Sequence, residues 1–302
     1  IGFAFHLFYT PFHHIQKYFD KDCSSKEQAR DAAWAYMDKV LDKDVKGVYA
    51  SQIGSNDKNV PPSSRTDLDG NDGAMLSIVK GEPRYIAQGF DRLMVDARIL
   101  MLGGYDTTTH VLAFSMGILA KEKHIGDKIR SEIRNVFGKD GITKDTNITT
   151  QHLAACPTAK GLFMEALRLH PPVPTMGGLM KKSIVVTTTG ETQYMLPKGT
   201  RTTFCFAAMN RSLPRDEHPD DAVPERWSSD DPHDHPFLGS FSIGPHTCPG
   251  KNLAMLEGHI ALLFLADRFE FDLAPNKNMY EYVSTCMTKP KNGMPLIVKK
   301  RV

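Results

Sequence analysis

The sequence predicts an α+β fold that is mostly helical. Long segments with helical periodicity lie at 86–121, 127–137, 156–170 and 251–269. Short segments rich in β-branched and aromatic residues lie at 183–197, 200–208, 269–273 and 295–300. The 302 residues are 41% hydrophobic, without internal repeats, so the chain can bury a sizeable core.

The first 85 residues hold fewer structural signals. The opening at 1–15 is apolar but interrupted by His and Pro, and it is too short to span a bilayer. A helix is predicted at 24–41, where Trp34, Met37 and Leu41 recur on one side. The segment at 54–73 is rich in Gly, Pro, Ser, Asn and Asp, which predicts a loop. We interpret that loop as an excursion within one domain, because the helical region before it is too small to fold alone.

The four predicted helices differ in how they are buried. The helix at 86–121 is apolar on nearly all sides of its second half, as expected for a helix through the middle of a domain. The helix at 127–137 is amphipathic and ends at Gly138, and the helix at 156–170 ends at a Pro-Pro pair. The helix at 251–269 is predicted to be core rather than membrane-binding, through Leu253, Leu256, Ile260, Leu263 and Phe264.

The β-rich segments predict a small sheet portion. The pattern at 183–197 indicates a hairpin that turns around Thr189-Gly190-Glu191. The segment at 200–208 is predicted to be a strand, and 269–273 and 295–300 are predicted to be short strands.

Charge and cysteine content exclude several classes of protein. A net charge of +2 gives no support to a nucleic-acid partner, which requires a strongly basic face. The number of cysteines is odd, they are widely spaced, and no CxxC pair occurs, which argues against a disulfide scaffold or a structural zinc site. A reducing compartment is therefore favoured. The cysteines are Cys23, Cys156, Cys205, Cys248 and Cys286.

Two glycines interrupt the longest predicted helix, within GGYDTTTH at 103–110. Each glycine in a helix interior costs about 1 kcal/mol relative to alanine. Close packing against a neighbouring helix would offset that cost, and so would a weakened or kinked turn that brings the backbone near a ligand. Asp106 and Thr107 follow the glycines, and an acid beside an alcohol is suited to passing protons into a closed site through water.

Glu165 and Arg168 are spaced i and i+3 on one face of the helix at 156–170. Apolar residues surround the pair, which favours a partly buried network over a surface ion pair. Arg226 lies in PERW at 224–227, and a second arginine there would help to satisfy both carboxylate oxygens.

The segment FSIGPHTCPG at 241–250 leaves the role of Cys248 open among a buried small residue, half of a disulfide and a metal ligand. Phe241, Gly244 and Gly250 fit a tight loop that leads directly into a helix. A thiolate just before a helix N-terminus gains from the positive end of the helix dipole.

Together these segments resemble the C-terminal portion of a cytochrome P450, a heme-thiolate monooxygenase. The heme loop of that family, Phe-x-x-Gly-x-x-x-Cys-x-Gly, matches 241–250, with Ala254 and Glu257 following. The central-helix motif matches GGYDTT at 103–108, the Glu-x-x-Arg motif matches EALR at 165–168, and PERW matches the PERF-like loop. The order and separations agree from about residue 75 to the end, which implies a single P450 catalytic domain over 1–302 that lacks its N-terminal part. Residues 1–85 match only loosely, and 86–302 hold the motifs.

The resemblance implies roles for individual residues. Cys248 would be the axial thiolate ligand of iron in heme b. Asp106 and Thr107 would help to protonate iron-bound dioxygen, and Gly103 and Gly104 would let the helix pass close over the heme. The remaining heme-site residues implied by the family are Phe241, Gly244, Gly250 and His246, the last as a propionate partner, with Glu165, Arg168 and Arg226 as a structural triad.

The chain departs from the family at one heme contact. Many members carry an arginine a few residues after the PPVP turn at 171–174, but here no basic residue occurs before Lys181. Heme anchoring would then depend on His246, or on Lys181 and Lys182.

The resemblance implies an oxidoreductase that inserts one oxygen atom from O2 into an apolar organic substrate. Electrons would come from an NADPH-dependent reductase or another donor. In a eukaryote the location would be the endoplasmic reticulum membrane, through an anchor in the missing N-terminal part. Residues on the long helix would border the substrate pocket, namely Met94, Ile99, Leu100, Leu102 and Tyr105. The alternatives are a non-catalytic or incomplete heme-binding fragment and a peroxide-driven peroxygenase.

Other charged and histidine-rich segments have plainer interpretations. His233, Asp234 and His235 are clustered, but adjacent loop residues rarely converge on one ion. His13 and His14 are interpreted as partly exposed residues at a helix start. The basic residues Lys251, Arg268, Lys181 and Lys182 are interpreted as scattered solvated charges rather than a docking face for an acidic electron donor.

Overall fold

A computed structural model describes residues 90–188, 190–212, 218–229, 238–275, 281–284, 287–291 and 293–301. The predictions for 1–85, for the His233 cluster and for His13 and His14 lie outside these residues. The chain divides into two compact units, Ile1–Tyr105 and Asp106–Val302. The elements described below belong to the second unit, except that the first helix begins in the first unit and continues into the second.

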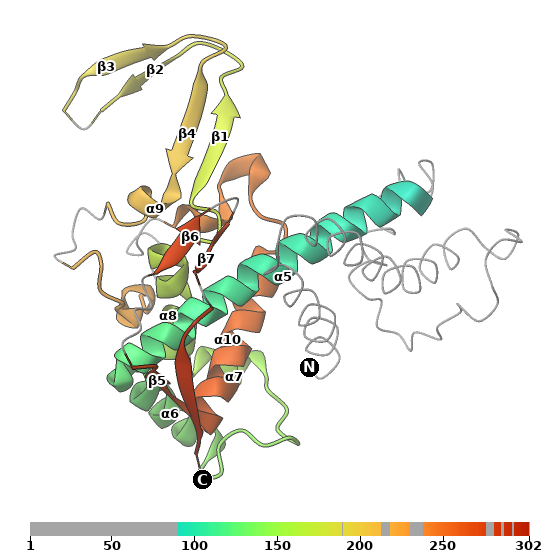
Figure 1. The fold of residues 1–302 in the computed structure, drawn as a ribbon, viewed down its shortest axis with the longest axis vertical. Helices are drawn as coiled ribbons and strands as arrows, with labels where there is room; N and C mark the ends of the chain where they lie inside the picture. The colour runs from blue at the N-terminus through green and yellow to red at the C-terminus, as the bar shows by residue number, and fades with distance from the viewer. Residues whose placement is uncertain are drawn as a thin grey trace, which may run out of the picture. The chain divides into compact units, whose positions relative to one another are not determined.

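Helices make up about half of the described chain and outweigh the strands (Figure 1). They are α5 (Phe90–Lys121), α6 (Lys123–Phe137), α7 (Thr150–Ala154), α8 (Pro157–Leu169), α9 (Phe206–Met209) and α10 (Lys251–Arg268). The α+β prediction, mostly helical, is confirmed.

The helix boundaries follow from capping and burial. Helix α6 begins at Lys123, four residues before its predicted start, because Ile125 is already part of the buried stripe that continues through Ile129 and Ile133. Helix α8 has proline in its first turn and stops at His170, just before Pro171. Helix α7 was not predicted, because it has only five residues, and it begins with a reciprocal cap between Thr149 and His152.

The core is built where α8 and α10 cross. Leu162 and Phe163 of α8 are buried against the same cluster as Leu262 and Leu263 of α10. The two helices approach so closely that a Cβ on Gly258 would lie 2.4 Å from the Phe163 ring. A side chain larger than hydrogen therefore does not fit at this crossing.

The prediction that α10 packs in the core is wrong for Leu253 and Leu256, which lie in its first two turns. Leu253 is 50% exposed and Leu256 is 47% exposed, whereas Leu263 is fully buried. The buried residues of α10 begin at Gly258. An apolar stripe predicts which side of a helix can be buried, but not how far its neighbours reach along it.

The strands of the described residues pair as four antiparallel ribbons (Figure 1). They pair β1 (Thr175–Leu179) with β4 (Arg201–Cys205), β2 (Ile184–Thr187) with β3 (Gln193–Leu196), β5 (Phe269–Leu273) with β8 (Leu296–Lys300), and β6 (Tyr282–Ser284) with β7 (Thr288–Pro290). The predicted hairpin and the two C-terminal strands are confirmed. The predicted strand at 200–208 ends at Cys205, because Phe206 turns into the core as the first residue of α9.

No helix in the described part of the chain is long and apolar enough to cross a membrane.

Candidate functional site

The segment before α10 is a tight loop that presents one thiol. Two short 3-10 turns form it, η4 (Gly239–Phe241) and η5 (Gly244–His246). The backbone N–H of Cys248 donates to the carbonyl oxygen of Phe241 at 2.8 Å, which closes the loop on itself. Ser242 and Gly244 have φ values of 60° and 69°, and at the second position glycine adopts this left-handed conformation without steric cost.

The structure excludes two of the three roles left open for Cys248. The side chain is exposed, so it is not a buried filler residue, and its thiol is free, as are those of Cys156 and Cys205. In the described part of the chain no group of three His, Cys, Asp or Glu residues is arranged to hold a metal ion. Cys248 therefore offers a single protein sulfur to any metal-containing ligand at this loop.

The sulfur lies at the start of an 18-residue helix. The backbone N–H of Lys251 donates to the Cys248 carbonyl oxygen at 3.3 Å, and Ala254 N–H donates to Gly250 at 2.9 Å. The positive end of the α10 dipole stabilises negative charge on this sulfur. Cys156 lies in a different environment, because it is buried in the core and burial raises the pKa of its thiol to about 11.

Two polar residues tie the loop to the end of α8. Asn210 donates from Nδ2 to the Arg168 carbonyl oxygen at 3.3 Å and accepts from the Gly239 N–H at 2.9 Å. Ser240 donates from its hydroxyl to the Leu167 carbonyl oxygen at 2.8 Å. Phe241 is buried in the main core cluster and anchors the loop from its apolar side. The sequence reasoning missed Asn210 and Ser240, because neither belongs to a recognisable spacing.

Behind the loop, Glu165 and Arg168 form a fully buried pair. Arg168 Nε and Nη2 donate to the two carboxylate oxygens of Glu165, both at 2.8 Å. Both side chains are 0% exposed. The pair is thus bidentate, the geometry in which arginine and carboxylate bind most strongly.

The PERW turn, η2 (Pro224–Trp227), supplies further donors to the same carboxylate. Arg226 Nη1 and the Val223 N–H donate to Glu165 Oε2 at 2.9 and 2.8 Å. Trp227 Nε1 donates to Oε1 at 2.9 Å. The structure therefore brings the three predicted residues together and adds Trp227, which the sequence reasoning treated only as part of a motif.

Backbone carbonyl groups accept the remaining hydrogen bonds of the two arginines in this network. Arg168 donates to the carbonyl oxygens of Pro219 and Asp221 at 2.5 and 2.9 Å. Arg226 donates to the carbonyl oxygens of His218 and Asp221 at 2.8 and 3.0 Å. One carboxylate and these carbonyl groups thus satisfy two guanidinium groups, as burial of charge requires.

The turn also packs directly on α8. A Cβ added to Gly161 would lie 2.4 Å from the Pro224 carbonyl oxygen. The backbone of η2 can reach the carboxylate of Glu165 only because residue 161 has no side chain.

On α5, the glycines and the acid and alcohol lie on a continuous helix. Among the residues described, no atom lies within 4 Å of a Cβ built on Gly103 or Gly104. Asp106 and Thr107 are half-buried, and Thr108 is buried. Ile99 and Leu102 are exposed on the same helix, and Met94 is buried.

The other predicted site residues are less constrained. His246 is exposed on η5, two residues before Cys248, and Lys181 and Lys182 are exposed in the turn after β1. Gly250 has an ordinary φ of −88°, and a Cβ there would make a normal contact of 3.9 Å with Cys248 Sγ. The structure therefore gives no steric reason for a glycine at position 250.

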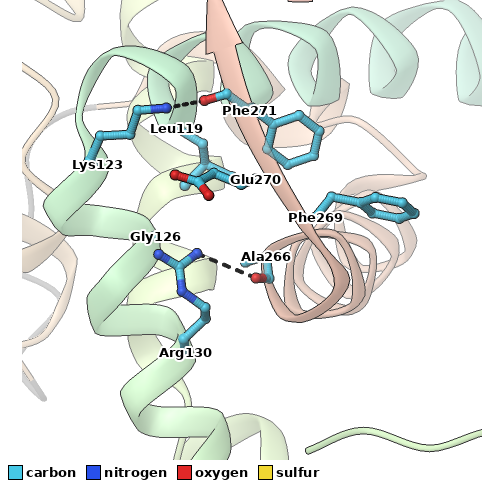
Figure 2. Close-up of a pocket in the computed structure, with 8 residues that line it drawn as sticks. All are labelled: Leu119, Lys123, Gly126, Arg130, Ala266, Phe269, Glu270 and Phe271. Carbon is cyan, nitrogen blue, oxygen red and sulfur yellow. Dashed lines mark hydrogen bonds between the residues drawn. The ribbon is translucent and has the colours of Figure 1, made fainter. Parts of the chain in front are cut away.

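A small pocket lies elsewhere, between α6, the end of α10 and β5 (Figure 2). Lys123 donates there to the Phe271 carbonyl oxygen and pairs with Asp272, and Arg130 donates to the Ala266 carbonyl oxygen and pairs with Asp127. None of the predicted site residues lines it. Both cations already have partners, so the pocket is not a candidate anion site.

Comparison with known proteins identifies one family. A family model described as Cytochrome P450 matches residues 2–297. Cytochrome P450 4d2 of Drosophila melanogaster is 30% identical over 202 residues, which is 67% of this chain and 38% of that protein. The mitochondrial 25-hydroxyvitamin D-1 alpha hydroxylase of Homo sapiens is 31% identical over 177 residues, covering 58% of this chain and 33% of that one.

A solved structure shares the fold. The crystal structure of cytochrome P450DA heme domain superposes with a TM-score of 0.61 at 20% sequence identity, covering 71% of this chain and 46% of that chain. The chain spans between 31% and 48% of the length of the curated relatives it matches.

Proposed function

The chain belongs to the cytochrome P450 family, and from that membership we propose that it forms the heme-binding part of a heme-thiolate monooxygenase. The observation that carries the proposal is the exposed thiol of Cys248, held at the start of α10 by a loop that is tied to a fully buried charge network. Because the chain spans less than half of each relative, its activity, substrate and partners belong to the proposal.

The donor set at the loop fits heme b. A heme supplies four nitrogen ligands of its own and needs one protein ligand on the proximal side, which a lone thiolate provides. Ile243, 69% exposed within the same loop, offers the apolar surface that a porphyrin requires. His246 and the lysines at 181 and 182 are the exposed basic groups proposed to meet the propionates.

When bound, the heme would supply the chemistry that adds one atom of O2 to a C–H bond and releases the other as water, using two electrons and two protons. Cys248 would hold the iron and donate electron density to it. Asp106 and Thr107 would deliver the protons from α5, whose backbone at Gly103 and Gly104 leaves room for a ligand. Glu165, Arg168 and Arg226 would fix the position of the loop without touching the substrate.

The partners follow from this reaction. The electrons would come from an NADPH-dependent reductase or another donor, and the substrate would be a small apolar organic molecule that contacts the exposed apolar residues of α5. We propose the endoplasmic reticulum membrane as the location. One relative is named as mitochondrial, so cell fractionation with markers for both organelles is the appropriate test.

The experiment is a reduced carbon-monoxide difference spectrum of the heme-loaded chain and of Cys248→Ala. The strongly red-shifted Soret band of a thiolate-ligated heme is expected in the wild type and lost in the variant. Cys205→Ala is the matched control, because it removes another exposed free thiol of the described residues and should leave the band intact.

Absence of the band in the wild-type chain would contradict the proposal. A band without turnover in the presence of a reductase would instead favour the alternative of an incomplete heme-binding fragment. Turnover with peroxide and no reductase would indicate a peroxygenase.

A further inference from the structure

His110 lies one helical turn after Asp106 on α5, and its ring leans back over that residue. Its Nε2 atom is 3.7 Å from Asp106 Oδ1. Side chains on a helix point toward its N-terminus, so a residue at i+4 can reach the one at i. At 3.7 Å the two atoms are too far apart for a hydrogen bond in this structure. Hydrogen bonds in active sites are often too long before ligands are bound and tighten when the site closes.

The two side chains differ in burial. The side chain of Asp106 is 42% exposed, and that of His110 is 14% exposed. The second ring nitrogen of His110, Nδ1, is buried without a hydrogen-bond partner among the residues that the structure describes. If the neutral ring carries its proton on Nε2, that N–H faces the carboxylate and Nδ1 is the acceptor.

Charged groups of opposite sign act on the ring. Burial lowers the pKa of His110 and is the largest effect. Asp106 on α5 raises this pKa, Lys289 on β7 lowers it, and the net shift is downward. The ring is therefore neutral near pH 7. A neutral donor can hold a carboxylate without cancelling its negative charge, so the carboxylate remains able to accept a proton and pass it on.

We propose that His110 is a positioning residue for Asp106, holding the carboxylate over α5 through its Nε2–H so that the acid beside Thr107 keeps one orientation. The inference rests on the proposed function, in which Asp106 supplies protons during oxygen activation. A half-exposed carboxylate has several rotamers of similar energy, and a hydrogen bond from a mostly buried ring selects one of them. His110 acts through Asp106 and does not itself meet the reacting atoms.

The first test measures the pKa of His110 by NMR of the heme-loaded chain in its diamagnetic ferrous carbon-monoxide form, with labelled histidine. Asp106→Asn should lower this pKa further, because it removes the charge that favours the protonated ring. Lys289→Gln should raise it, because it removes the opposing charge. Lys299→Gln is the control, since Lys299 pairs with Asp272 on another ribbon and should leave His110 unchanged.

The second test measures how tightly NADPH consumption is coupled to product formation, with a reductase and a substrate that the chain turns over. His110→Leu keeps the bulk of the ring and removes the donor, and His110→Gln restores a donor at similar reach. We expect His110→Leu to lower kcat about tenfold, which is less than the effect of losing a general acid. KM should change less than twofold, and more peroxide should be released for each NADPH consumed. His110→Gln should recover most of both.

The outcomes separate the two proposals. A wild-type chain without the red-shifted carbon-monoxide band would overturn the proposed function and this inference with it. An intact band, together with a His110 pKa that does not respond to Asp106→Asn, would overturn the inference alone. Equal losses in His110→Leu and His110→Gln would also overturn it, because they would indicate a packing role.

Discussion

The buried network around Glu165 and the loop that presents Cys248 are adjacent parts of one scaffold, but they are held in different ways. Glu165 is fully buried and accepts five hydrogen bonds from Arg168, Val223, Arg226 and Trp227. Cys248 is exposed, and the hydrogen bond that fixes its position comes from its backbone N–H. The reactive side chain is left free for a ligand, and the charge network behind it fixes the backbone. Stability and reactivity should therefore separate between the two regions.

Glu165→Ala should have the largest effect. It leaves two guanidinium groups and an indole N–H buried without their acceptor, which costs about 3–5 kcal/mol, much of the stability of a typical domain. We expect the variant to be insoluble or unfolded, as measured by circular dichroism and denaturant titration. Glu225→Ala is the control, because Glu225 lies in the same turn but pairs with Lys128 in an exposed ion pair worth under about 1 kcal/mol. Equal stability of the two variants would contradict the comparison.

His170, the residue that ends α8, should make stability depend on pH. Burial, with the positive charges of Arg211 and Arg168, lowers its pKa from 6.5 to about 4. Between these values the unfolded chain binds a proton that the folded chain does not, so stability falls as pH decreases from 6.5 to 4. The loss reaches about 3 kcal/mol at pH 4 and is absent above pH 6.5.

Denaturant titrations at several pH values would measure this dependence. His170→Phe keeps the ring that stacks on Phe114 and should reduce the slope between pH 4 and 6.5. His124→Phe, at a position 75% exposed, should leave the slope unchanged. The same slope in both variants would contradict a buried neutral His170.

Gly161→Ala should have an intermediate effect. The added Cβ would meet the Pro224 carbonyl oxygen at 2.4 Å and push η2 away from Glu165, at a cost of about 1–3 kcal/mol. Gly104→Ala is the matched control on α5, where the Cβ meets no described atom within 4 Å and helix propensity rises by about 1 kcal/mol. In thermal unfolding of the heme-free chain, Gly161→Ala should lower the melting temperature and Gly104→Ala should raise it. A lower melting temperature for Gly104→Ala would show that α5 is packed at that point.

Cys248→Ala should have the smallest effect on stability. Truncation of an exposed side chain costs less than about 0.5 kcal/mol. The heme-free variant should unfold at the same denaturant concentration as the wild type. A loss comparable to that of Glu165→Ala would mean that the thiol itself supports the fold.

Most of the fold could be predicted, because helical periodicity and β-branched runs are local signals. The positions of α8, of the β2–β3 hairpin and of the two C-terminal strands follow from such patterns. The length of α10 that is buried could not be predicted, since Leu253 and Leu263 have the same apolar character and differ only in what covers them. Helix α7 was missed because five residues are too few for a periodic pattern, and its Thr-His cap lacks the usual acidic residue as a signal.

The site is a harder case, because its residues come from distant segments. Spacing within short motifs predicted Glu165, Arg168, Arg226 and the loop of Cys248, and their roles as heme-site residues stay predictions. Asn210 has no such signal, because its partners are fixed only by the fold. Trp227 belongs to the PERW motif, but its hydrogen bond to Glu165 is likewise set by the fold. A His four residues after an acid on a helix is the one local pattern that would have drawn attention to His110.

The span of the Glu165 network has a consequence for synthesis of the chain. Glu165 lies 62 residues before Trp227, the last of its donors. At about 5–20 residues per second, roughly 3–12 seconds pass between the synthesis of Glu165 and that of this last donor. Until then, Arg168 on the same helix is the partner that α8 itself supplies to the carboxylate. During that interval the apolar surface and the buried charges of α8 are exposed to chaperones and to other nascent chains. Completion of the PERW turn is thus the step at which this part of the protein becomes protected from misassembly.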